Sequence, residues 1–284
     1  MNPKFLRNNE DFKHVASALS ILYNNRPDSY SKYSSNIKFE NYARIVKQYA
    51  KSNELVLDFG SGTWQLPYAL RCHGLQVEGI DLWSDADLQK QLEQMPINGP
   101  KLSRYNGELL PYPDNYFDVV CSLNVFEHLI NVDETLLEIN RVLKIGGKII
   151  ILAPNWLTIT APIHALYYQI ASKGRYWQFE SIIDVLIGIL RSLFLPIKLL
   201  LSRKSYFLYV FPRMEYGQIK FERSDDDVVH LSCPVSYKKW FKKHNYKILN
   251  YNINIGNGLI AKLFNYLFPD WATSVFIVAE KLKK

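Results

Sequence analysis

The stretch of residues 54–63 constrains the fold of this chain more than any other. The apolar run at 55–57 is typical of a strand that is buried on both faces of a parallel sheet. The run ends at Asp58, and Gly60 and Gly62 then predict a tight turn in which the backbone lies close to a ligand. A helix is predicted directly after the turn, so a ligand would meet backbone N–H groups at its N-terminus. Strand, glycine turn and helix in this order are typical of a nucleotide-binding α/β domain.

The residues around the turn indicate the kind of cofactor. A dinucleotide fingerprint, G-x-G-x-x-G, requires a glycine where this chain has Gln65. Asp58 stands directly before the turn, where its carboxylate would repel a diphosphate. Both features favour a cofactor with a cationic end. Asp81 ends the next apolar run about 20 residues beyond the turn, where a carboxylate accepts hydrogen bonds from both ribose hydroxyls or caps the next helix.

Five stretches occur together in one order. They are Val56-Leu-Asp-Phe-Gly-Ser-Gly-Thr63, Val77-Glu-Gly-Ile-Asp81, Leu110-Pro-Tyr-Pro-Asp-Asn-Tyr-Phe-Asp-Val-Val120, Phe126-Glu-His-Leu129, and the run from Glu138 to Asn155. Together they resemble the class I S-adenosylmethionine-dependent methyltransferases, most closely the broad type 11 group that includes quinone-biosynthesis methyltransferases. One position departs from the family: Trp64 replaces its third glycine, and either reshapes the methionine end of the pocket or packs behind it.

The resemblance implies an α/β fold with a Rossmann-like seven-stranded sheet and a closing antiparallel pair, and it implies S-adenosylmethionine as cofactor. In the family, an Asp or Asn after the third strand accepts from the adenine amino group and the next N–H meets the ring nitrogen. These roles fall to Asn106 and Gly107, while Asn124, after a strand at 117–123, would border the transferring methyl group. The expected cofactor-binding residues are Asp58, Gly60, Gly62, Asp81, Asn106, Gly107 and Asn124.

Two histidines are candidate catalytic residues. His128 follows the fourth strand, at the sheet edge where ligands bind, and an imidazole there can act as a general base toward a hydroxyl. His230 lies in a loop that would approach the cofactor from the side of an insertion. Either histidine can instead hold its loop through a backbone hydrogen bond. In related quinone O-methyltransferases a Glu-x-x-Glu-His cluster is associated with a divalent metal. Here the first glutamate is Asn124, so no metal site is predicted.

The rest of the chain predicts one elaborated domain with a helical insertion. Two helices are expected within residues 10–50, the second of which would cover one edge of the sheet. Residues 155–230 interrupt the family pattern and are expected to form a mainly helical, hydrophobic lid after the fifth strand. The methyltransferase core would then consist of residues 1–154 and 231–284.

The centre of the insertion, residues 181–201, approaches the length of a membrane span. Asp184, Arg191 and Lys198 would each cost about 2.5–3.5 kcal/mol near the bilayer centre, which disfavours a spanning helix. They recur every seven residues and predict one narrow polar stripe on an apolar helix. Such a helix would lie in the plane of a membrane with its stripe outward, or would pack as a lid or in a dimer with a kink at Pro196.

Charge is divided unevenly along the chain. Residues 51–150 hold 8 Lys and Arg against 14 Asp and Glu, a net charge of −6, whereas residues 151–284 hold 18 against 9, a net charge of +9. The basic flank favours an anionic partner, such as a lipid headgroup, a phosphorylated glycan or nucleic acid, or is an ordinary solvated surface. Nucleic acid is disfavoured, because the basic residues alternate with apolar ones and no Asn/Asp-Pro-Pro-Tyr-type motif is present.

The termini and cysteines predict the compartment. The N-terminal residues are polar and lack an apolar signal core, so secretion is not expected. Cys72, Cys121 and Cys233 have no C-x-x-C spacing and are expected to be buried, reduced thiols. We therefore expect a cytoplasmic protein with peripheral association at the inner face of the membrane. The sequence gives no oligomeric state.

The function predicted from the sequence is transfer of a methyl group from S-adenosylmethionine to a hydrophobic or lipid-linked small molecule, with oxygen as the acceptor atom. The sulfonium methyl group is already electrophilic, so the enzyme mainly aligns a substrate atom with it and needs no covalent nucleophile. Two alternatives remain. One is a non-catalytic membrane adaptor that binds S-adenosylmethionine, and the other is a nicotinamide-dependent reductase, which Asp58 and Gln65 disfavour.

Overall fold

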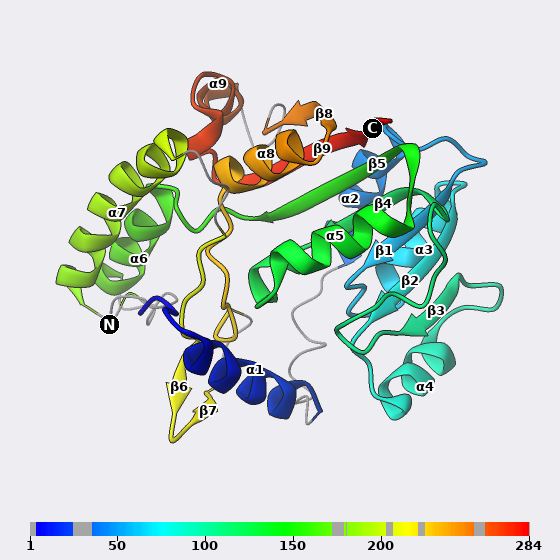
Figure 1. Cartoon of the computed structure of the whole chain (residues 1–284), viewed down its shortest axis with the longest axis horizontal. Coiled ribbons are helices and arrows are strands. Elements are labelled where there is room, and N and C mark those ends of the chain that lie inside the picture. The colour runs from blue at the N-terminus through cyan, green and yellow to red at the C-terminus, as the bar shows by residue number, and fades with distance from the viewer. Residues whose placement is uncertain are drawn as a thin grey trace.

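A seven-stranded mixed sheet lies at the centre of the chain, in the order β3-β2-β1-β4-β5-β9-β8 (Figure 1). β9 runs antiparallel to β5, and β8 runs antiparallel to β9. The expected fold class, with its closing antiparallel pair, is therefore confirmed. The strands are β1 (Leu55–Phe59), β2 (Gln76–Asp81), β3 (Lys101–Arg104), β4 (Phe117–Leu123), β5 (Leu143–Pro154), β8 (Tyr246–Tyr251) and β9 (Ser274–Lys281). The computed structural model describes residues 4–24, 36–171, 179, 181–202, 207–220, 225–252 and 259–283.

The central strands are apolar because both faces of the sheet are covered. Val56 and Leu57 of β1 are neighbours in sequence and point to opposite faces, yet both are fully buried. Leu57 pairs with Val120 of β4, which is also fully buried. This two-sided burial explains the short apolar run that precedes the glycine turn.

Helices cover both faces of the sheet. One face carries α2 (Asn36–Lys47) and α3 (Gln65–Cys72), and the other carries α5 (Val132–Val142) and α8 (Pro234–Lys243). The expectation that the second N-terminal helix covers an edge is wrong, because α2 packs Tyr42 into a cluster with residues of β1, β2, β4, β5 and β9. The Tyr42 hydroxyl also donates to the Ser122 carbonyl in β4, at 2.9 Å. Helices α1 (Asn9–Asn24) and α4 (Asp85–Gln94) complete this part of the chain.

The insertion after β5 is helical at first and then extended. It contains α6 (Thr160–Ile170), α7 (Ile182–Leu201) and a small antiparallel pair, β6 (Met214–Glu215) with β7 (Gln218–Ile219). Residues 208–210 pair with 229–231 through backbone hydrogen bonds of 2.8 Å. The N-terminal segment joins this pair, since the Leu6 N–H donates to the Tyr209 carbonyl at 3.0 Å. The assignment of residues 155–230 as a separate lid stays a prediction.

Helix α7 presents its small and polar residues to the protein. Asp184 and Ser192 are 8% and 1% exposed, and the Ser192 hydroxyl donates to the Thr158 carbonyl at 3.1 Å. A Cβ atom on Gly188 would lie 2.4 Å from the Phe179 ring, so only glycine permits this contact. The expectation of an outward polar stripe is therefore wrong for Asp184, because this side chain is buried and forms the capping box with Ser181 at the start of the helix. Lys198 alone of the three charged residues is exposed.

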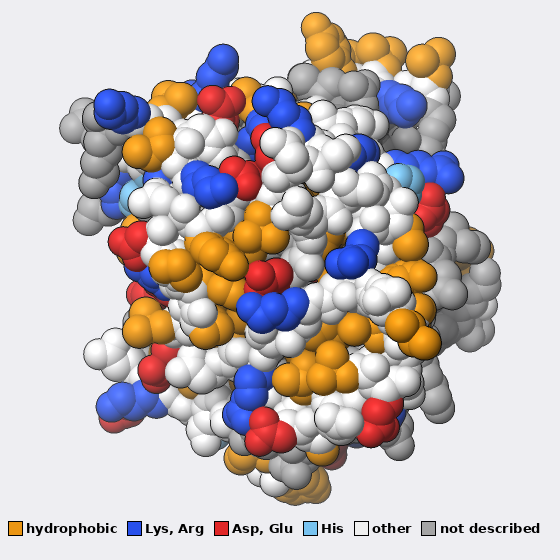
Figure 2. All heavy atoms as spheres, turned by 90° about the vertical axis from the view of Figure 1, so that its right-hand side faces the viewer, with side chains coloured by type: hydrophobic (Ala, Val, Ile, Leu, Met, Phe, Trp, Pro, Cys, Tyr) orange, Lys and Arg blue, Asp and Glu red, His pale blue; other side chains and the backbone are white. Residues whose placement is uncertain are grey.

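The opposite side of α7 is an exposed apolar surface. We call it, together with the outer sides of α6 and α9 (Leu259–Leu267), the apolar end of the molecule, which lies at the left and top of Figure 1. Figure 2 shows the face at the right-hand side of Figure 1, where acidic and basic side chains are scattered among the apolar ones. Large apolar residues with more than a third of their surface exposed on α7 are Ile182, Ile183, Leu186, Ile187, Leu190, Leu193, Phe194, Ile197, Leu200 and Leu201.

Two further expectations can be compared with the structure. In the described part of the chain, no helix combines the length and the hydropathy that a membrane span requires. Cys121 and Cys233 are buried free thiols, as expected, but Cys72 is exposed. The prediction for Cys72 is wrong because this residue ends α3, where the helix leaves the sheet surface.

Candidate functional site

The glycine turn after β1 has one packed side and one open side. Gly60 and Gly62 both have positive φ angles, 77° and 62°. A Cβ atom on Gly60 would lie 2.3 Å from a methyl carbon of Val125, whereas a Cβ atom on Gly62 would meet nothing within 4 Å. Gly60 therefore allows the loop after β4 to pack against the turn. Gly62 leaves open space on this side of the turn.

Asp81 places a carboxylate against this turn. Its Oδ2 accepts from the Gly62 N–H and its Oδ1 from the Leu82 N–H, both at 2.7 Å. The next helix is capped by Ser84 in a capping box, so Asp81 is not its cap. Each carboxylate oxygen has a second lone pair, with which it can accept from a ribose hydroxyl. A pyrophosphate would have to displace a like charge from the Gly62 N–H.

Asp58 is a second, deeper carboxyl group below the turn. It is fully buried, its Oδ1 accepts from the Cys121 thiol at 3.9 Å, and its Oδ2 has no hydrogen-bond partner among the described residues. Burial, with a smaller contribution from the charge of Asp81, raises the pKa of Asp58 to about 7. A cation placed beside the turn would favour the ionised form of Asp58. The pair of carboxyl groups therefore suits a ligand with a positive end.

Protein side chains contact the start of α3, where a ligand was expected. The Trp64 N–H, at the helix N-cap, donates to the Gln91 side-chain carbonyl at 3.1 Å. The Trp64 indole packs edge-on against Tyr68 of the same helix, with 5.6 Å between ring centroids. Whether the indole reshapes the methionine end of the pocket or packs behind it stays a prediction. One of the backbone N–H groups expected to face a ligand at the start of α3, that of Trp64, therefore already has a partner within the protein.

The other expected cofactor-binding residues lie at the same edge of the sheet. Asn106 and Gly107 follow β3, and the Asn106 amide oxygen accepts from the Glu108 N–H at 3.0 Å. Gly107 has a φ angle of 89°. Asn124 follows β4 with a φ angle of 53°, and its side chain is exposed. Their contacts with adenine and with the methyl group stay predictions.

His128 forms an ion pair with an acidic residue of the insertion. It ends the short helix η2 (Phe126–His128) after β4, and its Nδ1 lies 3.1 Å from Oδ1 of Asp227. Its Nε2 lies 3.8 Å from Oε1 of Glu127. The Tyr23 hydroxyl of α1 donates to the other Asp227 oxygen at 3.1 Å. Three segments far apart in the sequence therefore meet around one imidazole.

The charges around His128 determine its protonation. Burial by itself would lower the pKa of His128, but the negative charge of the paired Asp227, with Glu127 and Asp225, raises it to about 10. Burial raises the pKa of Glu127 to about 7, against the opposing effect of His128. His128 is therefore an imidazolium at neutral pH. His128 can accept a proton only in the fraction of protein molecules in which its ring is neutral.

His230 is neutral and closed in. Its Nδ1 lies 2.9 Å from the Phe126 carbonyl, which can only accept, so Nδ1 carries the hydrogen. Its Nε2 has no hydrogen-bond partner among the described residues. Burial lowers the pKa of His230 to about 4. The ring is fully buried among Phe207, Tyr209 and Tyr237, at centroid distances of 5.4–5.9 Å.

Asp227 and Tyr23 are site residues that were not predicted from the sequence. The acidic run Asp225-Asp-Asp was visible, but nothing in its spacing connected it with a histidine 99 residues earlier. The described residues contain no group of three or more His, Cys, Asp and Glu side chains that could hold a metal ion.

Comparison with known proteins points to one family. A family model described as a methyltransferase domain matches residues 57–151. A ubiquinone/menaquinone biosynthesis C-methyltransferase of Francisella tularensis is 29% identical over 115 residues, 38% of this chain and 46% of that protein. An uncharacterized methyltransferase of Geobacillus kaustophilus is 33% identical over 117 residues, 39% of this chain and 53% of that protein. The chain thus spans about half the length of these curated relatives.

Solved structures share the fold. A putative S-adenosylmethionine-dependent methyltransferase from Listeria monocytogenes superposes with a TM-score of 0.51 at 16% identity, covering 87% of this chain and 100% of its own. The 1,6-didemethyltoxoflavin-N1-methyltransferase of Burkholderia thailandensis was solved with bound 1,6-didemethyltoxoflavin and S-adenosylhomocysteine. It superposes with a TM-score of 0.51 at 11% identity, and the match covers 98% of this chain and 92% of that chain. At these identities the likeness concerns the fold alone.

Proposed function

We propose that this chain is a class I, S-adenosylmethionine-dependent methyltransferase of the type 11 group, and that it transfers a methyl group from S-adenosylmethionine to a hydroxyl of a hydrophobic or lipid-linked small molecule at a membrane surface. The single observation that carries the choice of cofactor is the contact between Asp81 and the Gly62 N–H, at 2.7 Å. This contact supports a cationic methyl donor over a dinucleotide, since the N–H that a pyrophosphate would use already faces a carboxylate.

The residues around the turn fit the proposed cofactor. Asp81 would hold the ribose hydroxyls, and Asp58 would place negative charge near the cationic end of the donor. The donor supplies, when bound, a methyl group on a positively charged sulfur. The protein then has to align an acceptor oxygen with that group and to remove its proton.

The His128–Asp227 pair is the candidate for proton removal. The His128 side chain is 16% exposed, whereas His230 is fully buried, so only His128 can reach an acceptor. Asp227 orients the ring through Nδ1, which leaves Nε2 as the atom that would take the acceptor's proton. His230 acts as a positioning residue in this proposal, because its Nδ1–H holds the carbonyl of Phe126, two residues before His128.

The apolar end of the molecule supports a hydrophobic acceptor delivered from a membrane. On α9, Leu263 and Tyr266 are 56% and 64% exposed, while Asn265 is 2% exposed. Helix α9 thus resembles α7 in having a buried polar residue, Asn265, while its large apolar residues, like Lys262, face outward. Exposed apolar surface of this extent is typical of membrane or protein interaction sites.

Transfer of labelled methyl groups tests the proposed function. The protein is incubated with methyl-labelled S-adenosylmethionine and fractionated cell lipids, and the labelled product is identified by mass spectrometry and NMR. A methoxy product in the lipid fraction is expected. A C-methyl product would contradict the oxygen acceptor, and the name of the Francisella relative makes carbon the second candidate. Label in no fraction, with the cofactor bound in calorimetry, would favour the non-catalytic adaptor, and binding of a nicotinamide cofactor would favour the reductase.

A further inference from the structure

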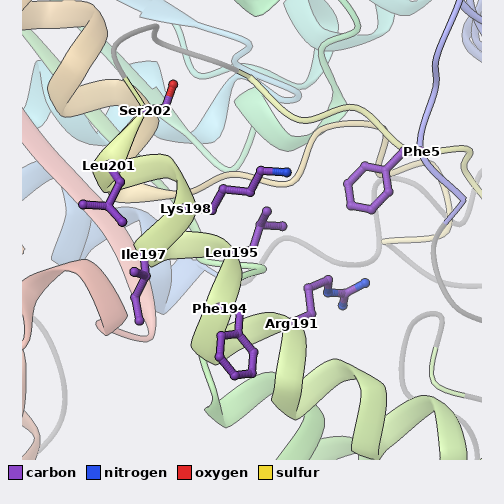
Figure 3. A pocket seen from close by; sticks show the side chains of 8 residues that line it. All are labelled: Phe5, Arg191, Phe194, Leu195, Ile197, Lys198, Leu201 and Ser202. Atoms are coloured by element: carbon purple, nitrogen blue, oxygen red, sulfur yellow. The ribbon is translucent and has the colours of Figure 1, made fainter.

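A groove runs between the second half of α7 and the N-terminal segment. Its volume is about 800 Å³, and Figure 3 shows the described residues that line it. Phe5 forms one wall and is fixed by a β-bridge to Val210 in the insertion. The lining residues are Phe5, Arg191, Phe194, Leu195, Ile197, Lys198, Leu201 and Ser202.

The described lining combines apolar walls with two cations and no carboxylate. Arg191, Leu195 and Lys198 are spaced four and three residues apart, so they share one face of α7. Figure 3 shows the three side chains directed toward Phe5. The two cations are therefore on the same side of the groove, with an apolar side chain between them. This arrangement complements an anion that is attached to an apolar body.

Arg191 lies in surroundings that strengthen its attraction for an anion. It is partly buried, and its guanidinium lies 5.9 Å from the centre of the Phe179 ring. Attraction between opposite charges is stronger where water is excluded, and guanidinium groups match the geometry of phosphate oxygens. Lys198 is exposed at the side of the groove and adds a second positive charge.

The groove opens onto the apolar end of the molecule. Phe194, Ile197 and Leu201 line it, yet they are also 66%, 44% and 81% exposed. A hydrocarbon chain could therefore run from the two cations along α7 without leaving apolar surface. No described residue that lines the groove belongs to the methyl-transfer site. The N-terminal segment that carries Phe5 pairs with residues 209–211, residues 208–210 pair with 229–231, and residues 229 and 230 donate to the Glu127 carbonyl.

We propose that this groove binds the phosphate headgroup of an anionic membrane phospholipid between Arg191 and Lys198, with the adjoining acyl chain lying along Phe5, Leu195 and the exposed side of α7. Binding would hold the apolar end of the molecule against an anionic bilayer. The proposal deepens the membrane surface of the proposed function, but it requires neither the methyl donor nor catalysis.

Flotation with vesicles tests the groove with the full chain. Vesicles of phosphatidylcholine alone are compared with vesicles that also contain phosphatidylglycerol, without S-adenosylmethionine. We expect the unmodified protein to float with the anionic vesicles, and we expect Arg191→Gln/Lys198→Gln to bind them at least about tenfold more weakly. The matched control Lys242→Gln/Lys243→Gln removes two exposed positive charges from α8 and is expected to keep most of the binding.

Other results would overturn the proposal. Equal loss in the groove variant and the control would mean that net charge alone drives binding, and equal flotation with both vesicle types would mean that the headgroup is not recognised. Calorimetry with inorganic phosphate distinguishes a free anion, and binding of phosphate without binding of vesicles would contradict a lipid. Sedimentation of a dimer that does not float would assign the surface to a second copy of this chain.

A second variant distinguishes loss of lipid binding from loss of folding. Leu195→Trp would fill the groove without changing its charge, and it is expected to weaken flotation while thermal melting stays unchanged. Methyl transfer is measured on the same samples. Loss of flotation with methyl transfer intact concerns the groove, whereas absence of methyl transfer with flotation intact contradicts the proposed function and leaves the groove supported.

Discussion

Helices α5 and α7 are both amphipathic, but they turn opposite faces toward the protein. Helix α5 buries its aliphatic residues, including Leu136 and Ile139, against the sheet. Helix α7 buries Asp184, Gly188 and Ser192 along with Val185, Pro196 and Leu199, and leaves most of its leucines and isoleucines on the surface. The difference follows from what each helix meets. A sheet offers a broad apolar surface, whereas the neighbours of α7 offer a smaller apolar cluster, a close contact with the Phe179 ring and the Thr158 carbonyl.

The largest expected effect separates these two helices. Leu136→Asp would bury a carboxylate in the core below α5, and we expect it to reduce the free energy of unfolding by about 4 kcal/mol or more. Leu193→Asp changes a residue of α7 that is 40% exposed, and we expect a change within about 1 kcal/mol. Urea unfolding measures both variants. Equal destabilisation would show that the outer face of α7 is covered in solution.

The inner face of α7 gives the next largest effect. Gly188→Leu makes an apolar helix more apolar, yet its side chain would overlap the Phe179 ring, and we expect a loss of about 1–3 kcal/mol. The control Leu190→Ala removes apolar surface from the exposed face and should change stability by about 0.5 kcal/mol or less. Thermal and urea unfolding provide the comparison. A Gly188→Leu variant as stable as the unmodified protein would contradict the inward face.

The His128–Asp227 pair connects the loop after β4 with the insertion, and it predicts a pH dependence of stability and of methyl transfer. Since the His128 pKa of about 10 lies above its unfolded value of 6.5, the ion pair stabilises the fold fully below pH 6.5, and this stabilisation is lost as the pH rises through about 10. If neutral His128 is the base, the methyl-transfer rate should rise with pH toward 10. A base at His230, with its pKa of about 4, would instead give a rate that is flat above pH 5.

Replacement of Asp227 sharpens this prediction. Asp227→Asn removes the charge that raises the His128 pKa, so the rise in rate should move to lower pH. Loss of ring orientation should reduce kcat by about 10- to 100-fold, or about 1.4–2.7 kcal/mol. The control is Asp226→Asn, which changes the neighbouring carboxylate that pairs with Arg213 at 3.7 Å. A pH profile that Asp227→Asn leaves in place would exclude His128 as the base.

The smallest expected effect concerns the glycine turn alone. The Asp58 pKa of about 7 is raised above its usual 3.8, so the ionised group destabilises the fold increasingly between pH 3.8 and 7. Asp58→Asn should therefore stabilise the protein without cofactor at pH 8, by about 1 kcal/mol or more, and weaken S-adenosylmethionine binding several-fold. Melting curves and calorimetry test both changes. Unchanged affinity would show that Asp58 does not sense the donor, and vesicle flotation should not change.

The sequence by itself determined the local elements and the carboxylates at the turn. The strand at Phe117–Leu123, the helix at Asp85–Gln94 and the closing antiparallel pair follow from periodicity and family pattern, because burial imposes a fixed spacing on strands and helices. Asp58 and Asp81 are brought to the turn because they lie in the last two residues of neighbouring parallel strands, at the same edge of the sheet.

Only the tertiary structure decided what each face meets. The seven-residue spacing on α7 was visible, but spacing defines a helix face and does not say whether that face meets protein or solvent. The contact between Gly188 and the Phe179 ring, seen only in the structure, shows that the small residues of α7 point inward. The partner of His128 is likewise an aspartate from the insertion, and its charge decides whether the imidazole is protonated. Such contacts depend on the path of the chain in space, which residue spacing does not specify.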